Sequence, residues 1–120
     1  TSRYEYSYDE LVTNETLSEQ FNRNLIEAGI PEEQIESGKD NGSLDLGNVS
    51  ARCPAIHPYV KIVEERLMLH TEAFRDAAMT DKALDRMIFG AKMLAATAYD
   101  VMADPALRAR IRAEFEAGRK

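Results

Sequence analysis

The sequence has a single cysteine, Cys53, and no apolar run approaching the roughly 18 residues of a membrane-spanning helix. One cysteine cannot form an internal disulfide, so nothing indicates an oxidising compartment. The N-terminal residues TSRYEYSY are polar and aromatic and lack the apolar core of a signal peptide. We therefore expect a cytoplasmic protein.

Positive charge is also scarce. The chain has 15 Lys and Arg against 21 Asp and Glu, which gives a net charge of -6. Binding to a phosphate backbone needs clustered Lys and Arg, and so does binding to an anionic membrane surface. The charge balance therefore argues against nucleic acid and membrane as partners.

The usual signatures of a self-contained catalytic site are missing. The sequence has no Gly-rich phosphate-binding loop, no paired Cys and no His-x-x-x-His, and its two histidines are His57 and His70. A zinc centre needs three or four protein ligands. Nothing in the chain completes such a set around either histidine, so we do not expect a metalloenzyme that functions with this chain alone.

Two stretches have the pattern of β-strands. In residues 3–8, RYEYSY, tyrosines alternate with polar residues, which is the period of a half-buried strand. Residues 55–63, AIHPYVKIV, are β-branched and aromatic enough for a second strand. Pro58 would confine that strand to a sheet edge or break it, because proline offers no N–H to a neighbour.

A first helix is predicted from about residue 15 to residue 28. Asn14 suits its N-cap, Gly29 suits a left-handed C-terminal cap, and Pro31 prevents continuation. Four apolar residues share one face of this helix at spacings of three and four. They are Leu17, Phe21, Leu25 and Ala28.

The last third of the chain is predicted to be helical. A long helix begins at Thr80 or Asp81 and carries an apolar stripe rich in alanine. Asp104-Pro105 ends it and starts a shorter helix that ends at Gly118. The stripe consists of Leu84, Met87, Ile88, Ala91, Leu94, Ala95, Ala98, Val101 and Met102.

These elements predict an α/β fold with two to three strands and a long C-terminal helix. With 120 residues, the chain fits one small domain or a part of a larger one. Two or three strands beside a long apolar helix make a poor core by themselves. We expect that the stripe is covered either by further sequence of a larger domain or by another copy in an oligomer.

Few residues are candidates for chemistry. Cys53 follows Arg52, whose charge could lower the pKa of the thiol, although a packed, inert thiol is the commoner outcome. His57 precedes a proline, where histidine is usually structural. Ser43 and Asp45, in the stretch GSLDLGN, are most simply a Ser–Asp turn or a helix cap.

The segment around His70 has two interpretations. Its periodicity fits a helix over residues 64–78, with His70 one residue away from the apolar face. Alternatively, LHTE lies in a loop that places His70 two residues from a carboxylate. That arrangement suits a metal ligand with an acidic neighbour.

Three stretches taken together resemble a known family. They are GSLDLGNVSARCPAIHPY, LHTEAF and AKMLAATAYDVMADPALRARIRAEF. In this order and spacing they resemble the C-terminal end of the metal-dependent amidohydrolase/zinc peptidase family, which includes aminoacylases, aminobenzoyl-glutamate hydrolases and β-alanyl dipeptidases. YDELVTNETLSEQFNRNL, further upstream, fits the same region, so the resemblance covers nearly the whole chain.

The resemblance implies a division of the chain. Residues 1–10 would be the last strand of a lid or dimerisation domain, and residues 11–120 would be the C-terminal part of an α/β catalytic domain. The stripe from Leu84 to Met102 would then pack on a sheet supplied by sequence outside this chain. A homo-oligomer is expected.

The resemblance also implies a reaction, which is hydrolysis of the amide bond of dipeptides, N-acyl amino acids or aminobenzoyl-glutamate by a pair of metal ions, usually zinc. His70, in His70-Thr71, matches the last metal ligand and favours the loop interpretation of 64–70. Ser43 and Asp45 match a turn beside the substrate, but Leu44 replaces the usual Thr. Asn48 and His57 match the pattern without an assigned role.

The remaining metal ligands and the general-base Glu of the family lie outside this chain. The segment should therefore hold no metal and catalyse nothing in isolation. The alternative is a truncated, non-catalytic homologue that acts as an oligomerisation or interaction module.

Overall fold

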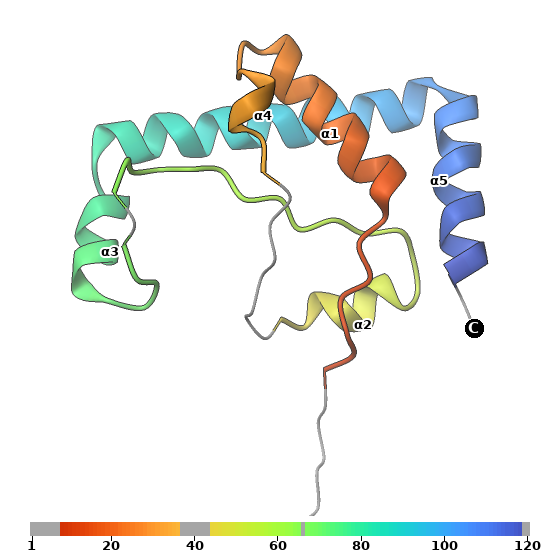
Figure 1. Ribbon diagram of the computed structural model, residues 1–120, viewed down its shortest axis with the longest axis horizontal. Coiled ribbons are helices and arrows are strands. Elements are labelled where there is room, and N and C mark those ends of the chain that lie inside the picture. The colour runs from red at the N-terminus through yellow and green to blue at the C-terminus, as the bar shows by residue number, and fades with distance from the viewer. Residues whose placement is uncertain (1–7, 37–43, 66, 119–120) are drawn as a thin grey trace, which may run out of the picture.

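The computed structural model describes residues 8–36, 44–65 and 67–118. These residues form helices joined by irregular segments, in the arrangement of Figure 1. In chain order the elements are α1 (Glu15–Glu27), the short 3-10 helix η1 (Glu32–Gln34), α2 (Leu46–Ser50), α3 (Glu72–Ala78), α4 (Asp81–Ala103) and α5 (Pro105–Gly118). No β-strand occurs in the described ranges, so the predicted α/β fold with two to three strands is wrong for them.

The predicted strand over 55–63 is an irregular segment that runs beside α4. Val60 packs on this helix, since a Cβ at Gly90 would lie 3.3 Å from Cγ2 of Val60. The β-branched residues are thus used in packing on a helix, and the described residues offer no neighbouring strand to pair with. Of the predicted strand 3–8, only Tyr8 is described, and it is not in a strand. The division into 1–10 and 11–120 stays a prediction.

The first predicted helix is confirmed. The side-chain oxygen of Asn14 accepts a hydrogen bond from the backbone N–H of Leu17 at 3.0 Å, which satisfies one of the free donors at the start of α1. The helix ends at Glu27, and Gly29 takes a positive φ of 94°. Glycine adopts that conformation without steric cost, so the C-terminal end falls where the sequence predicts it.

The two C-terminal helices also begin where the sequence predicts. Thr80 caps α4 by accepting a hydrogen bond from the backbone N–H of Ala83. The carboxylate of Asp104 accepts hydrogen bonds from the N–H groups of Leu107 and Ala106, and these bonds lower the pKa of Asp104. Pro105 stands at the first position of α5, where its missing N–H costs nothing.

The core lies where α1, α4 and α5 pack together, and α3 packs on the N-terminal part of α4 (Figure 1). Its buried apolar residues are Phe21, Ala55, Ala83, Leu107 and Ile111. Polar groups also join the helices: the amide of buried Asn24 donates to Oγ1 of Thr97 and to the carboxylate of Asp100, both at 2.9 Å. A paired polar contact of this kind fixes how α1 is placed on α4.

The predicted apolar stripe of α4 lies on the face opposite these contacts. Leu84, Met87, Ile88, Leu94 and Met102 are 45–71% exposed. The accessible surface of the chain is 9646 Å². A compact protein of 13.5 kDa is expected to expose about 6500 Å².

Within the described residues, no helix is long and apolar enough to cross a membrane.

Candidate functional site

His70 has an unusual backbone. Its φ is 62°, and no other non-glycine residue among those the structure describes has a positive φ. The left-handed region brings the Cβ of an L-residue close to the following carbonyl oxygen, which costs about 1–2 kcal/mol. Strained residues of this kind concentrate at functional sites, so the conformation singles out the histidine that the sequence pointed to.

A loop rather than a helix carries His70. The described residues between Glu64 and Thr71 are not helical, and α3 begins only at Glu72. The helix interpretation of 64–78 is therefore wrong over its first half, and the loop interpretation is confirmed. The apolar periodicity of Leu67, Thr71, Phe74 and Ala78 is used only from Glu72 onward, because Thr71 caps the helix and the residues before it form the turn.

Thr71 organises the turn around His70. Its hydroxyl donates a hydrogen bond to the carbonyl oxygen of Met68 at 2.8 Å. The hydroxyl oxygen of Thr71 also accepts a hydrogen bond from the backbone N–H of Phe74 at 3.2 Å, which caps α3. One side chain thus closes the turn that contains His70 and attaches that turn to the following helix.

The loop that leads to this turn is also tied to α4. The carboxylate of Glu64 lies 2.7 Å from Nζ of Lys82 on α4 and 3.0 Å from Nζ of Lys61. Hydrogen bonds from Lys82 and Lys61, together with their charges, lower the pKa of Glu64 to about 2. All three side chains are exposed, so the pairs orient the loop more than they stabilise it.

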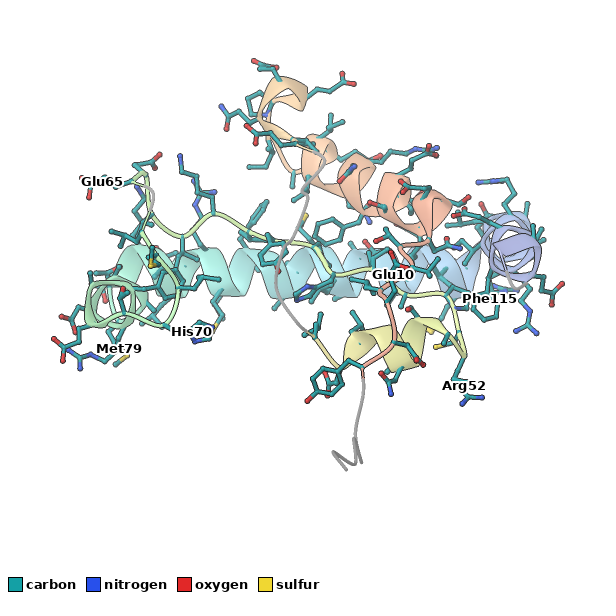
Figure 2. All side chains as sticks on the ribbon, turned by 60° about the horizontal axis from the view of Figure 1, so that its bottom comes forward. Glu10, Arg52, Glu65, His70, Met79 and Phe115 are labelled. Atoms are coloured by element: carbon teal, nitrogen blue, oxygen red, sulfur yellow. The ribbon has the colours of Figure 1, made fainter. Side chains whose placement is uncertain are left out.

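The imidazole of His70 is exposed at the end of the molecule where α3 meets α4, and Met79 and Glu65 lie at the same end (Figure 2). Among the described residues, no three His, Cys, Asp or Glu side chains gather to hold a metal ion. An exposed imidazole on a turn has the donor chemistry for one position of a metal centre. The other positions would need residues outside those described.

The structure does not bring Asp45, the other described candidate site residue, to His70. Ser43 lies outside the described residues. Asp45 precedes α2, is exposed, and makes no side-chain cap with that helix. In Figure 1, α2 lies well apart from α3, which follows His70. Neither the predicted cap at Asp45 nor a joint site with His70 is observed.

The residues that follow Asp45 have a structural role that the sequence analysis missed. A Cβ at Gly47 would lie 1.7 Å from the carbonyl oxygen of Asp9, so the chain before α1 passes directly against the backbone of α2. The Asn48 side chain accepts a hydrogen bond from the N–H of Asp9, and Oγ of Ser50 accepts one from Val12. The sequence signal for this close contact was Gly47 followed by Asn48 and Ser50, a glycine with two short side chains that can form hydrogen bonds.

Cys53 and His57 carry no identified chemistry. Cys53 is an exposed free thiol whose Sγ donates to the carbonyl of Val49 at 3.6 Å, so the expectation of a packed thiol is wrong. The imidazole of His57 is exposed and meets the ring of Tyr59 edge-on, with centroids 4.8 Å apart. These contacts are local and do not connect either residue to the turn at His70.

A cavity of about 350 Å³ lies between the start of α1, α2 and α5. Its carboxylate, Glu114, is already used: it accepts hydrogen bonds from the N–H groups of Glu15 and Thr16 and from the Thr16 hydroxyl. Burial acts to raise the pKa of Glu114, but these hydrogen bonds outweigh it and the pKa is lowered. Phe115 on its wall and His70 lie at opposite ends of the molecule (Figure 2), so this cavity is separate from the candidate site.

Comparison with known proteins relates the chain to enzymes that cleave dipeptides. It is similar to the Xaa-Arg dipeptidase of Mus musculus, with 38% identity over 114 residues that cover 92% of this chain and 26% of the mouse protein. The Xaa-Arg dipeptidase of Homo sapiens is 36% identical over 114 residues, which cover 92% of this chain and 26% of the human protein. The chain thus spans about a quarter of the length of the curated relatives it matches.

No protein-family model matches the chain. No solved structure matches it either. The similarity to dipeptidases supports the part of the predicted resemblance that concerns peptidases. It does not extend to the aminoacylases, aminobenzoyl-glutamate hydrolases or β-alanyl dipeptidases that the sequence analysis named.

Proposed function

We propose that this chain is part of a metal-dependent peptidase that hydrolyses the amide bond of dipeptides, and that His70 supplies one metal ligand. The observation that carries the proposal is the left-handed backbone of His70, at the position where the resemblance places a ligand. A folded protein keeps such a conformation only when the surrounding structure enforces it. Here Thr71 forms hydrogen bonds to Met68 on one side of the turn and to Phe74 on the other.

The names of the relatives suggest the substrate. Both are Xaa-Arg dipeptidases, so dipeptides with a C-terminal arginine are the first substrates to test. N-acyl amino acids and aminobenzoyl-glutamate are further amides of the same class. Ser43 and Asp45 stay proposed contacts to the substrate, reached in the assembled enzyme.

The cofactor we propose is a pair of divalent ions, zinc foremost, which would polarise the amide carbonyl. The neutral imidazole of His70 offers a nitrogen lone pair, and its place on an exposed turn lets it reach a site formed with other polypeptide. The described residues supply no complete site. We therefore propose that the 120-residue chain alone is inactive, and that the assembled enzyme is cytoplasmic.

The test uses the longest polypeptide encoded in the reading frame that contains this chain. It would be incubated with Xaa-Arg dipeptides, with dipeptides ending in an acidic residue and with N-acyl amino acids, before and after treatment with a chelator. We expect hydrolysis of Xaa-Arg dipeptides that the chelator abolishes and added zinc restores. Hydrolysis that survives removal of the metal, or no hydrolysis of any dipeptide, would contradict the proposal.

Matched histidine variants assign the residue. His70→Ala should lower activity by at least about tenfold, because a metal centre that loses a ligand loses affinity and geometry. His57→Ala is the control, since His57 is the second exposed histidine and its imidazole meets the ring of Tyr59, away from the turn. Equal activities of the two variants would remove His70 from the site.

One observation favours a second candidate function. The exposed apolar face of α4 is the kind of surface through which proteins associate. A non-catalytic homologue could use it to form homo-oligomers. This alternative predicts association that depends on the α4 face, together with no metal and no hydrolysis in the longest polypeptide.

A further inference from the structure

We propose that Thr71 is a positioning residue for His70: its hydroxyl holds the preceding turn closed and thereby keeps His70 in the left-handed backbone conformation. The use of His70 as a metal ligand rests on the proposed function. The control of its backbone by Thr71 rests on geometry alone. The two parts are therefore tested separately below.

The geometry places Thr71 where it bonds to both sides of the turn. Its oxygen bridges the carbonyl of Met68, two residues before His70, and the N–H of Phe74, four residues after it. A hydroxyl can donate once and accept at the same time, so both bonds form together. One hydroxyl therefore takes part both in the turn that contains His70 and in the cap of α3.

The cap matters because α3 has only seven residues. A helix this short is not stable by itself in water and depends on its cap and its packing. The packing of α3 on α4 fixes the direction of the helix, and Thr71 transmits that direction to the turn. His70 is thereby presented at a defined angle even though its side chain is exposed.

The chain contains a matched control for this role. Thr80 makes the same two bonds at the start of α4: its hydroxyl donates to the carbonyl of Ala77 at 2.8 Å and accepts from the N–H of Ala83 at 3.3 Å. No residue near Thr80 has the left-handed conformation of His70. Removal of either hydroxyl should therefore weaken a helix cap, and only removal of the one at Thr71 should affect His70.

The first test needs no metal. Thermal unfolding of the metal-free longest polypeptide would be compared for Thr71→Val, His70→Gly and the double variant. Glycine adopts a positive φ without help, so Thr71→Val should lower the melting temperature by less when residue 70 is glycine. If Thr71→Val lowers the melting temperature equally with His and with Gly at position 70, the inference is overturned, whether or not His70 binds metal.

The second test measures zinc affinity by competition with a chelating indicator. We expect Thr71→Val to weaken binding by about tenfold, as loss of a supporting residue typically does. Thr71→Ser keeps the hydroxyl and should stay within about twofold of the natural chain, since both hydrogen bonds can still form. Thr80→Val should lower the melting temperature while leaving zinc affinity unchanged.

The outcomes separate the two proposals. If His70→Ala loses zinc while Thr71→Val binds it as well as Thr80→Val does, the positioning role is wrong and the ligand assignment stands. If His70→Ala keeps its zinc, the ligand assignment is wrong, and the unfolding comparison with glycine alone decides the role of Thr71.

Discussion

Among the glycines that the structure describes, Gly47 is the one at which an added Cβ should disturb the fold most. Its Cβ would lie 1.7 Å from the carbonyl oxygen of Asp9, and the obstacle is backbone rather than a flexible side chain. We predict that Gly47→Ala lowers the free energy of unfolding by about 1–3 kcal/mol or more, because the segment before α1 must move away from α2. Urea titration followed by circular dichroism measures this loss.

Gly118 provides the control for that substitution. A Cβ there meets nothing within 4 Å, so Gly118→Ala should change the free energy of unfolding by under about 1 kcal/mol. Should the two alanine variants unfold at the same urea concentration, the close approach of residue 9 to α2 would be refuted.

The residues that mark helix ends were the most predictable part of the molecule. Asn14, Thr80 and Asp104 each cap the helix that follows them, as the sequence predicted. A cap bond joins residues two or three positions apart, so the local sequence contains all the information needed. The predicted cap at Asp45 is wrong. A residue of the right type stands before α2, but its side chain makes no cap bond.

The backbone of His70 could not be predicted in this way. A positive φ is uncommon in any residue other than glycine, and although histidine is enriched there, its presence alone does not predict it. The family resemblance pointed to His70 as a ligand and to a loop around it. The hydrogen bonds of Thr71, which explain how the loop is held, appear only in the structure.

At the scale of elements, a carboxylate from α5 caps α1. Glu114 accepts hydrogen bonds from the N–H groups of Glu15 and Thr16, two of the donors that a helix leaves unpaired at its start. We predict that Glu114→Gln lowers the free energy of unfolding by about 1 kcal/mol at neutral pH, the usual worth of an N-cap. Glu116→Gln removes only an exposed pair with Arg112 and is the matched control.

The contribution of Glu114 should depend on pH. Its pKa in the folded protein is lowered from the usual 4.5, so the carboxylate stabilises the fold above that value. The stabilisation is lost as the pH falls through the lowered pKa, since the folded state must then take up the proton. Unfolding measured from pH 7 to pH 3 should show the difference between the natural chain and Glu114→Gln shrinking. A constant difference would contradict the cap.

The prediction of a strand over residues 55–63 failed because strands depend on neighbours that sequence does not specify. Residues 55–63 have the composition of a strand, but the described residues offer no strand to pair with, and Val60 packs over Gly90 of α4 instead. Strand propensity reports how well side chains fit a half-buried surface, and a helix also provides such a surface. Composition alone could not say whether that surface was a sheet or a helix.

At the scale of the whole molecule, we expect the exposed apolar face of α4 to determine whether the chain self-associates in solution. Five large apolar side chains on it are 45–71% exposed, in a chain whose buried apolar core is small. We predict that the 120-residue chain self-associates in light scattering at micromolar concentration, because contiguous apolar surface drives association. The double variant Met87→Glu and Leu94→Glu should scatter as a monomer with unchanged helix content.

Two other exposed methionines test whether this association is specific. Met68 and Met79 lie outside α4 and are 78% and 77% exposed. The double variant Met68→Glu and Met79→Glu adds the same charge and should leave the association unchanged. Loss of association in both double variants would show that added charge, rather than the α4 face, is responsible.

The central claim is that His70 provides a metal ligand in a peptidase that needs more polypeptide than this chain. Elemental analysis of metal content tests it most directly, on the 120-residue chain, the longest polypeptide of its reading frame and the His70→Ala variant of that polypeptide. We predict about two divalent ions per molecule in the long form, as in two-metal hydrolases, a lower content in His70→Ala and none in the short chain. A stoichiometric metal in the short chain, or a full complement in His70→Ala, would contradict the account.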